Sequence, residues 1–105
     1  MSGKPDNQKM KQKKLLIVDD EVLIREGLKS LFESEPFIGK VIDAGSREEF
    51  LQLFYHSIDI VLLDFKLPDT NGLELLQWAR NKNSEVKVVA LTGLDGTEVI
   101  LNLLK

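Results

Sequence analysis

Short apolar runs alternate along the chain with segments in which apolar residues recur at helical spacing. The runs are rich in leucine, valine and isoleucine and predict strands at 15–18, 41–42, 58–63 and 86–91. The third run is almost wholly apolar, which is typical of a strand buried on both faces of a parallel sheet. Strand and helix alternate four times, and this predicts an α/β fold with a doubly wound parallel sheet and right-handed crossovers.

The segments between the runs have one apolar face each. Pro36 ends the first helical pattern, Ser46 and Glu49 form a capping box before the second, and Asp95 or Thr97 can cap a last helix. The residues expected to be buried are Ile24, Leu28, Leu31 and Phe32, then Phe50, Leu53 and Phe54, then Leu75, Leu76 and Ala79, and finally Val99, Ile100, Leu103 and Leu104.

Acidic residues and one hydroxyl follow directly on the predicted strands. Asp19 and Asp20 follow the first, Asp64 the third and Thr92 the fourth. Each has an ordinary alternative role, as a helix cap or in a turn. Because parallel strands end at the same edge of a sheet, we expect the four side chains to lie together where α/β proteins bind ligands.

Carboxylates gathered at such an edge raise one another's pKa and lower stability unless a cation neutralises them. Oxygen ligands with open positions suit Mg²⁺, which shares its coordination with phosphate groups. Asp64 could then act as a nucleophile on a phosphoryl donor, with the Thr92 hydroxyl bonded to a phosphoryl oxygen. Asp43 has no evident partner at this edge.

Length and charge narrow the function classes. The 105 residues allow a single domain, and we expect a flexible basic tail at 1–13 followed by the domain at 14–105. The net charge of −3 is unevenly spread, since the tail is rich in lysine and the rest is acidic, which disfavours nucleic-acid binding. No apolar run approaches a membrane span or a signal peptide, so we expect a cytoplasmic protein.

Three motifs resemble the receiver domain of bacterial two-component response regulators. They are Leu-Leu-Ile-Val-Asp-Asp-Glu at 15–21, Val-Leu-Leu-Asp-Phe-Lys-Leu-Pro-Asp-Thr-Asn-Gly at 61–72 and Val-Val-Ala-Leu-Thr-Gly at 88–93. The resemblance implies a flavodoxin-like sheet of order 2-1-3-4, the family order 2-1-3-4-5 without its fifth strand. The residues at 22–28 are similar to receivers that precede a helix-turn-helix domain, although no such domain is present in this sequence.

The resemblance also implies site roles. Asp64 would be the phosphoacceptor for a histidine kinase, and Thr92 the switch hydroxyl. The magnesium ligands would be Asp20, Asp64 and the backbone carbonyl of Lys66, with Asp19 bound through water. The domain would be a signalling switch and not a turnover enzyme.

The family pattern continues with a fifth strand, its lysine and a fifth helix, which this sequence lacks. Lys105 is expected in the fourth helix, and Lys66 could substitute for the missing lysine. Without a fifth strand, we expect an open edge on the fourth strand, self-association through that edge and weaker phosphorylation.

Two alternatives stay open. One is a receiver-like interaction or dimerisation module in which phosphorylation is impaired. The other is a haloacid-dehalogenase-like phosphatase, although Glu21 stands where that family has a second aspartate. The kinase, the signal and the output are not specified by the sequence.

Overall fold

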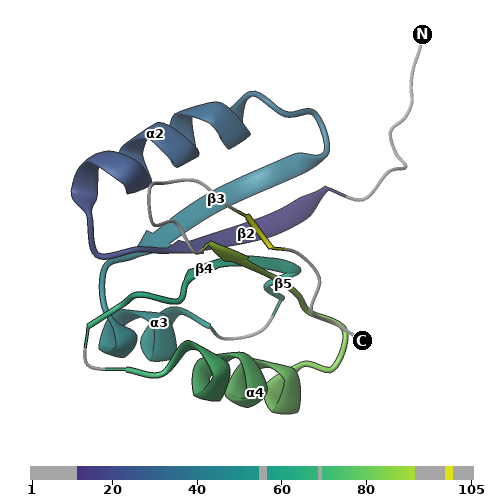
Figure 1. Ribbon diagram of the computed structural model, residues 1–105. Helices are drawn as coiled ribbons and strands as arrows, with labels where there is room; N and C mark the ends of the chain where they lie inside the picture. The colour runs from purple at the N-terminus through teal and green to yellow at the C-terminus, as the bar shows by residue number, and fades with distance from the viewer. Residues whose placement is uncertain (1–11, 55–56, 69, 92–98, 101–105) are drawn as a thin grey trace, which may run out of the picture.

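The computed structural model describes residues 12–54, 57–68, 70–91 and 99–100, which form a single sheet with helices on both faces (Figure 1). The strands are β2 (Lys13–Val18), β3 (Ile38–Ala44), β4 (Ile60–Asp64), β5 (Lys87–Leu91) and β6 (Val99–Ile100). The helices are α2 (Val22–Glu33), α3 (Arg47–Leu53) and α4 (Gly72–Lys82). Residues 1–11 lie outside the described part of the chain, so the basic tail stays a prediction there, but Lys13 belongs to β2 and not to the predicted tail at 1–13.

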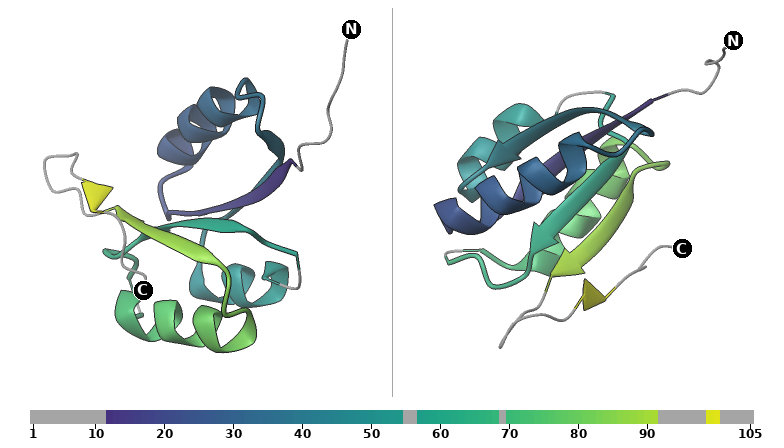
Figure 2. Two further views of the ribbon diagram at one scale, coloured as in Figure 1. Left: turned by 90° about the vertical axis from the view of Figure 1, so that its right-hand side faces the viewer. Right: turned by 90° about the horizontal axis from the view of Figure 1, so that it is seen from above.

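Strands β3, β2, β4 and β5 are parallel and lie in that order, with β6 added beside β5. With β2 counted as the first strand, the four parallel strands lie in the order 2-1-3-4. The predicted order and the flavodoxin-like arrangement are therefore confirmed. Helix α2 covers one face, and α3 and α4 cover the other (Figure 2). The order places β2 and β4 side by side at the centre, where the chain changes its direction of winding and open α/β sheets bind ligands.

Two apolar cores lie on opposite faces of the sheet because the side chains of its central strands alternate. In β2, Leu15 and Ile17 belong to the core beneath α2, whereas Leu16 and Val18 belong to the core beneath α3 and α4. All four are buried. This explains the continuous apolar run at 15–18, since both faces of the strand must be apolar.

Polar side chains fix the starts of α3 and α4. The Glu49 N–H donates to Ser46 Oγ at 3.1 Å, as the capping box predicts, but Glu49 Oε1 accepts from Gly45 N at 2.7 Å and not from Ser46. At α4, Asn71 Oδ1 accepts from the Leu73 N–H at 2.8 Å. These bonds satisfy amides that have no partner within the helix.

Some predicted buried positions are wrong. Ile24 and Leu31 of α2 are 43% and 57% exposed, and Leu53 of α3 is 36% exposed. In α2, Leu28 and Phe32 make the contacts with the core beneath it. A helical spacing specifies which residues share a face, but not how much of that face a neighbouring element covers.

The predicted last helix is wrong at Val99 and Ile100, which form β6. They pair antiparallel with Leu91 and Ala90 of β5. The prediction of an open edge on β5 is therefore wrong at Leu91 and Ala90. Periodicity does not separate strand from helix in an apolar run this short, and β-branched residues favour a strand. Within the described residues, 87–89 of β5 have no strand partner on that side. Asp95, Thr97, Leu103, Leu104 and Lys105 lie outside the described part.

Among the described helices, none combines the length and the apolar character needed to cross a membrane.

Candidate functional site

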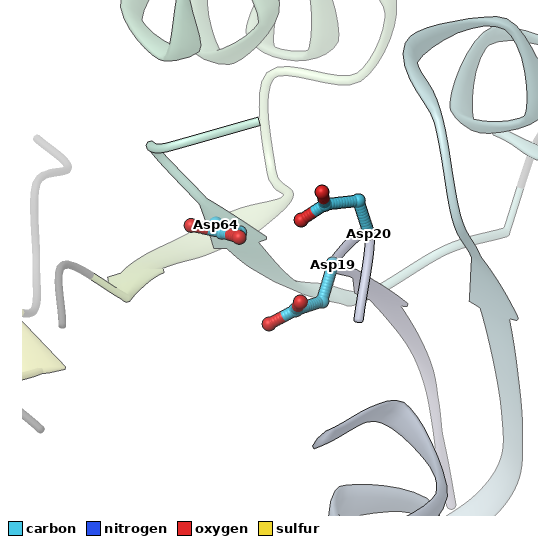
Figure 3. A group of neighbouring side chains, drawn as sticks. All are labelled: Asp19, Asp20 and Asp64. Carbon is cyan, nitrogen blue, oxygen red and sulfur yellow. The ribbon is translucent and has the colours of Figure 1, made fainter. Parts of the chain in front are cut away.

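Three aspartates meet at the carboxyl ends of β2 and β4. Val18 and Leu63 are register partners in this parallel pair, so Asp19 and Asp64, which follow them, end the strands at the same level. Asp20 is next along the chain, and Figure 3 shows Asp19 and Asp20 leaving the end of β2 beside Asp64. One carboxylate oxygen from each residue lies within 4.8 Å of the others. The predicted cluster of acids is therefore present in the structure.

Asp19 is the buried member of the cluster, at 6% exposed, whereas Asp20 is exposed and Asp64 is half-buried. Burial raises the pKa of Asp19, and the negative charges of Asp64 and Asp20 raise it further. The Glu21 N–H donates to Asp19 Oδ1 at 2.8 Å and partly opposes that rise in pKa. The ionised form of Asp19 is thus less stable in the folded protein than in the unfolded chain, and a cation would relieve this cost.

The turn after Asp64 folds back on the carboxylate. The Lys66 N–H donates to Asp64 Oδ1 at 2.8 Å, which places the backbone of Lys66 beside the cluster. Leu67 is buried in the core beneath α3 and α4 and anchors the turn. The Lys66 side chain is exposed, and the ion pairs between described residues all involve Asp43. The structure thus gives no contact by which the Lys66 ammonium would replace a missing lysine.

Gly72 gives the same turn room to close. A Cβ atom there would approach the Phe65 ring to 2.6 Å, so the ring occupies the space in which the Cβ atom of any other residue would lie. Phe65 in turn contacts the core beneath α3 and α4. The glycine in the second motif therefore has a packing role in placing the residues that follow Asp64.

Arg25 and Asp43 were missed as site residues. Arg25 Nη1 donates to the backbone oxygen of Asp19 at 2.8 Å, and Arg25 Nε donates to Asp43 Oδ2 at 2.8 Å. Lys29 Nζ lies 3.4 Å from Asp43 Oδ1. The arginine connects α2 to β3 and to the end of β2, three elements whose contact cannot be inferred from residue spacing. No pattern in the sequence therefore indicates the role of Arg25.

The donor set suits Mg²⁺. The three acids are aspartates, their oxygens lie close together, and Asp20 is open to solvent. A hard cation that retains water ligands fits such a group better than a metal that prefers nitrogen or sulfur. Thr92 follows Leu91, the register partner of Asp64, but lies outside the described residues.

Comparison with known proteins identifies the family. A family model described as the response regulator receiver domain matches residues 15–105. The chain belongs to this family. The receiver domain is a signalling domain, and the match disfavours the alternative of a haloacid-dehalogenase-like phosphatase.

Among curated proteins, the receiver is 32% identical over 92 residues to the nitrate/nitrite response regulator NarL of Escherichia coli K12, covering 87% of this chain and 43% of NarL. It is 29% identical over 102 residues to the transcriptional regulatory protein DegU of Brevibacillus brevis, covering 94% of this chain and 43% of DegU. The chain therefore spans less than half the length of these relatives.

Among solved structures, a CheY-like receiver domain protein from Methanospirillum hungatei matches with a TM-score of 0.70 and 32% identity, covering 79% of this chain and 66% of that one. The response regulator TrrA of Thermotoga maritima matches with a TM-score of 0.63 and 38% identity, covering 73% of this chain and 66% of that one. The TrrA structure is a complex with Mg²⁺ and BeF.

Proposed function

We propose that this receiver domain takes a phosphoryl group from the phosphohistidine of a histidine kinase onto Asp64, with Mg²⁺ as cofactor. The observation that supports this most strongly is the meeting of Asp19, Asp20 and Asp64 within 4.8 Å at the switch point of the sheet. The similarity to a receiver solved with Mg²⁺ and BeF supports the same assignment.

In this proposal Asp64 is the nucleophile. Its carboxylate oxygen forms a bond to phosphorus while the bond between phosphorus and the histidine nitrogen of the kinase breaks, and the freed imidazole recovers a proton from solvent. Asp64 suits this role because it is half-buried and is held by the Lys66 N–H, which leaves its second oxygen without a bond to a described residue.

The other residues hold the ion and orient the reactants. Asp20, Asp64 and the backbone carbonyl of Lys66 would hold Mg²⁺ directly, and Asp19 would hold it through water. When bound, Mg²⁺ neutralises charge on the transferring phosphoryl group. The Thr92 hydroxyl donates to a phosphoryl oxygen once Asp64 is modified. Positioning and electrostatics account for most of this kind of catalysis.

The product is a modified protein that signals, and we propose no turnover of a small substrate. The cytoplasmic location of the domain and the absence of nucleic-acid binding by these residues stay predictions. The transcriptional regulators among the relatives are longer proteins, and their outputs are not carried over to this chain.

A second candidate is an interaction module that associates with its own copies. Two observations favour it: residues 87–89 of β5 have no strand partner on one side within the described part, and Leu23 and Leu31 of α2 are 80% and 57% exposed. Light scattering over a range of concentrations tests it. A dimer that forms without phosphorylation would support this module, and a monodisperse monomer at high concentration would contradict it.

The test of the leading proposal is incubation with acetyl phosphate and Mg²⁺, followed by intact mass measurement. The parent chain should gain one phosphoryl group and the Asp64→Asn variant should gain none. A gain of one phosphoryl group by Asp64→Asn as well would reject Asp64 as the acceptor.

A further inference from the structure

The backbone that carries the acidic cluster is held by one arginine. Arg25 reaches from the second turn of α2 and donates from Nη1 to the backbone oxygen of Asp19 at 2.8 Å. The same guanidinium donates from Nε to Asp43 Oδ2 on β3, also at 2.8 Å. Because the guanidinium group is planar, two short bonds to different elements fix its position and its orientation.

This arrangement is more enclosed than a surface ion pair. The side chains of Arg25 and Asp43 are 17% and 25% exposed. Gly45 leaves the space for the arginine, since a Cβ atom there would approach Nη1 to 2.6 Å. A lysine could not make both bonds in the same plane, because its ammonium is a single compact donor group on a flexible stem.

Few other bonds hold the turn between β2 and α2. The sheet fixes its beginning, where Asp19 N donates to Ala44 O at 3.1 Å. Glu21 caps α2 without a side-chain hydrogen bond, and its N–H is bonded instead to the carboxylate of Asp19. The carbonyl of Asp19 belongs to the peptide bond that leads to Asp20, so the bond from Arg25 holds the backbone between the two carboxylates.

We propose that Arg25, held in place by Asp43 and given room by Gly45, is a positioning residue that directs Asp19 and Asp20 toward the magnesium ion. The inference rests on the proposed function, because it names the residues that prepare the same metal site. Arg25 acts through the backbone of Asp19 and does not touch the ion or the phosphoryl group.

The direction in which Mg²⁺ affinity changes when Arg25 is replaced distinguishes a positioning role from the effect of its charge alone. A guanidinium close to a cation site repels the cation, so removing its charge alone should tighten Mg²⁺ binding. Loss of a group that orients metal ligands weakens binding, typically by about 10- to 100-fold. Positioning therefore predicts a change in Mg²⁺ affinity opposite to the change that electrostatics predicts.

The experiment titrates Mg²⁺ alone into the ¹⁵N-labelled chain and follows the amide resonances of Glu21 and Lys66, which donate to Asp19 and Asp64. In Arg25→Met, the apolar stem is kept and both donors are lost; we expect affinity to fall about tenfold. The matched control is Lys29→Met. Lys29 is a cation on the same helix and lies beside the same Asp43, but it makes no bond to Asp19. We expect its affinity to be unchanged or slightly higher.

A further variant keeps the test informative if Arg25→Met does not fold. Gly45→Ala changes no charge but displaces the guanidinium, so it should weaken Mg²⁺ binding severalfold. Asp43→Asn is used only in combination with Arg25→Met, because loss of its negative charge would by itself weaken Mg²⁺ binding. If Asp43 acts through Arg25, the double variant Arg25→Met with Asp43→Asn should bind only slightly more weakly than Arg25→Met alone.

The outcomes separate the two proposals. Equal or tighter Mg²⁺ binding by Arg25→Met or Gly45→Ala, with the resonances of the sheet unchanged, would overturn the positioning role while the metal site stands. Equal loss in Lys29→Met would overturn it too, because the effect would then belong to the charge of the helix. A parent chain that does not bind Mg²⁺ would overturn both this inference and the metal site of the proposed function.

Discussion

Asp19 and Asp64 end two neighbouring parallel strands at the same level, since each follows one member of the register pair Val18 and Leu63. The pair belongs to different segments of the chain, and only the parallel register of β2 with β4 brings the two side chains together. Their like charges and the burial of Asp19 make the isolated site a cost to stability that a cation can remove.

Replacing Asp19 should therefore stabilise the isolated protein. Its pKa is raised in the folded state, so the parent loses stability as the pH rises through the unfolded value toward the folded value, and the loss is complete above the folded pKa. At pH 7 without Mg²⁺, we expect Asp19→Asn to raise the free energy of unfolding, because the amide carries no charge to be buried beside Asp20 and Asp64. Urea unfolding between pH 4 and pH 7 measures both the gain and its pH dependence.

Asp59→Asn is the control for that substitution. Asp59 Oδ2 also accepts a backbone N–H, from Lys14 at 2.8 Å, but lies at the opposite end of β4. Saturating Mg²⁺ should stabilise the parent and Asp59→Asn alike and stabilise Asp19→Asn less. An equal response of Asp19→Asn to Mg²⁺ would show that Asp19 does not contribute to the metal site.

Asp43 should show the opposite dependence on pH. Burial alone would raise its pKa, but the hydrogen bond from Arg25 and the charge of Lys29 outweigh burial and lower it. The stabilisation is then fully present above the unfolded pKa and is lost as the pH falls through the lower folded pKa. We expect Asp43→Asn to lower the free energy of unfolding by about 1 kcal/mol at pH 7 and to change it very little well below the folded pKa. Urea unfolding at both pH values would show this difference. A cost that persists unchanged in acid would contradict the ion pair.

Gly72→Ala should destabilise the protein although it improves helix propensity. Alanine at the first position of α4 would gain up to about 1 kcal/mol from propensity, but its Cβ would meet the Phe65 ring at 2.6 Å. Overpacking of this kind costs about 1 to 3 kcal/mol, so the clash should dominate. Gly27→Ala in α2 is the matched control, because nothing lies within 4 Å of its Cβ position, and it should gain about 0.5 to 1 kcal/mol. Thermal unfolding of both variants gives the comparison, and a stable Gly72→Ala would refute the packing role.

The parallel sheet and its acidic edge could be predicted because both depend on local order. Each strand is a short apolar run, and each acid stands directly after one, so the alternation of strand and helix is enough to bring Asp19, Asp20 and Asp64 to one edge. Arg25 could not be predicted, because its two bonds join α2 to Asp43 on β3 and to the end of β2. The last helix was predicted from the spacing of apolar residues, but Val99 and Ile100 instead pair with β5 and extend the sheet, because spacing does not separate strand from helix in so short an apolar run.

Intact mass spectrometry can show whether Asp64 receives a phosphoryl group. The parent chain, Asp64→Asn and Asp59→Asn would each be incubated with acetyl phosphate in Mg²⁺ and, separately, with a chelator. We expect one added phosphoryl group on the parent and on Asp59→Asn in Mg²⁺, and none on Asp64→Asn or with the chelator. Equal phosphorylation of Asp64→Asn, or no phosphorylation of the folded, Mg²⁺-bound parent, would contradict this expectation.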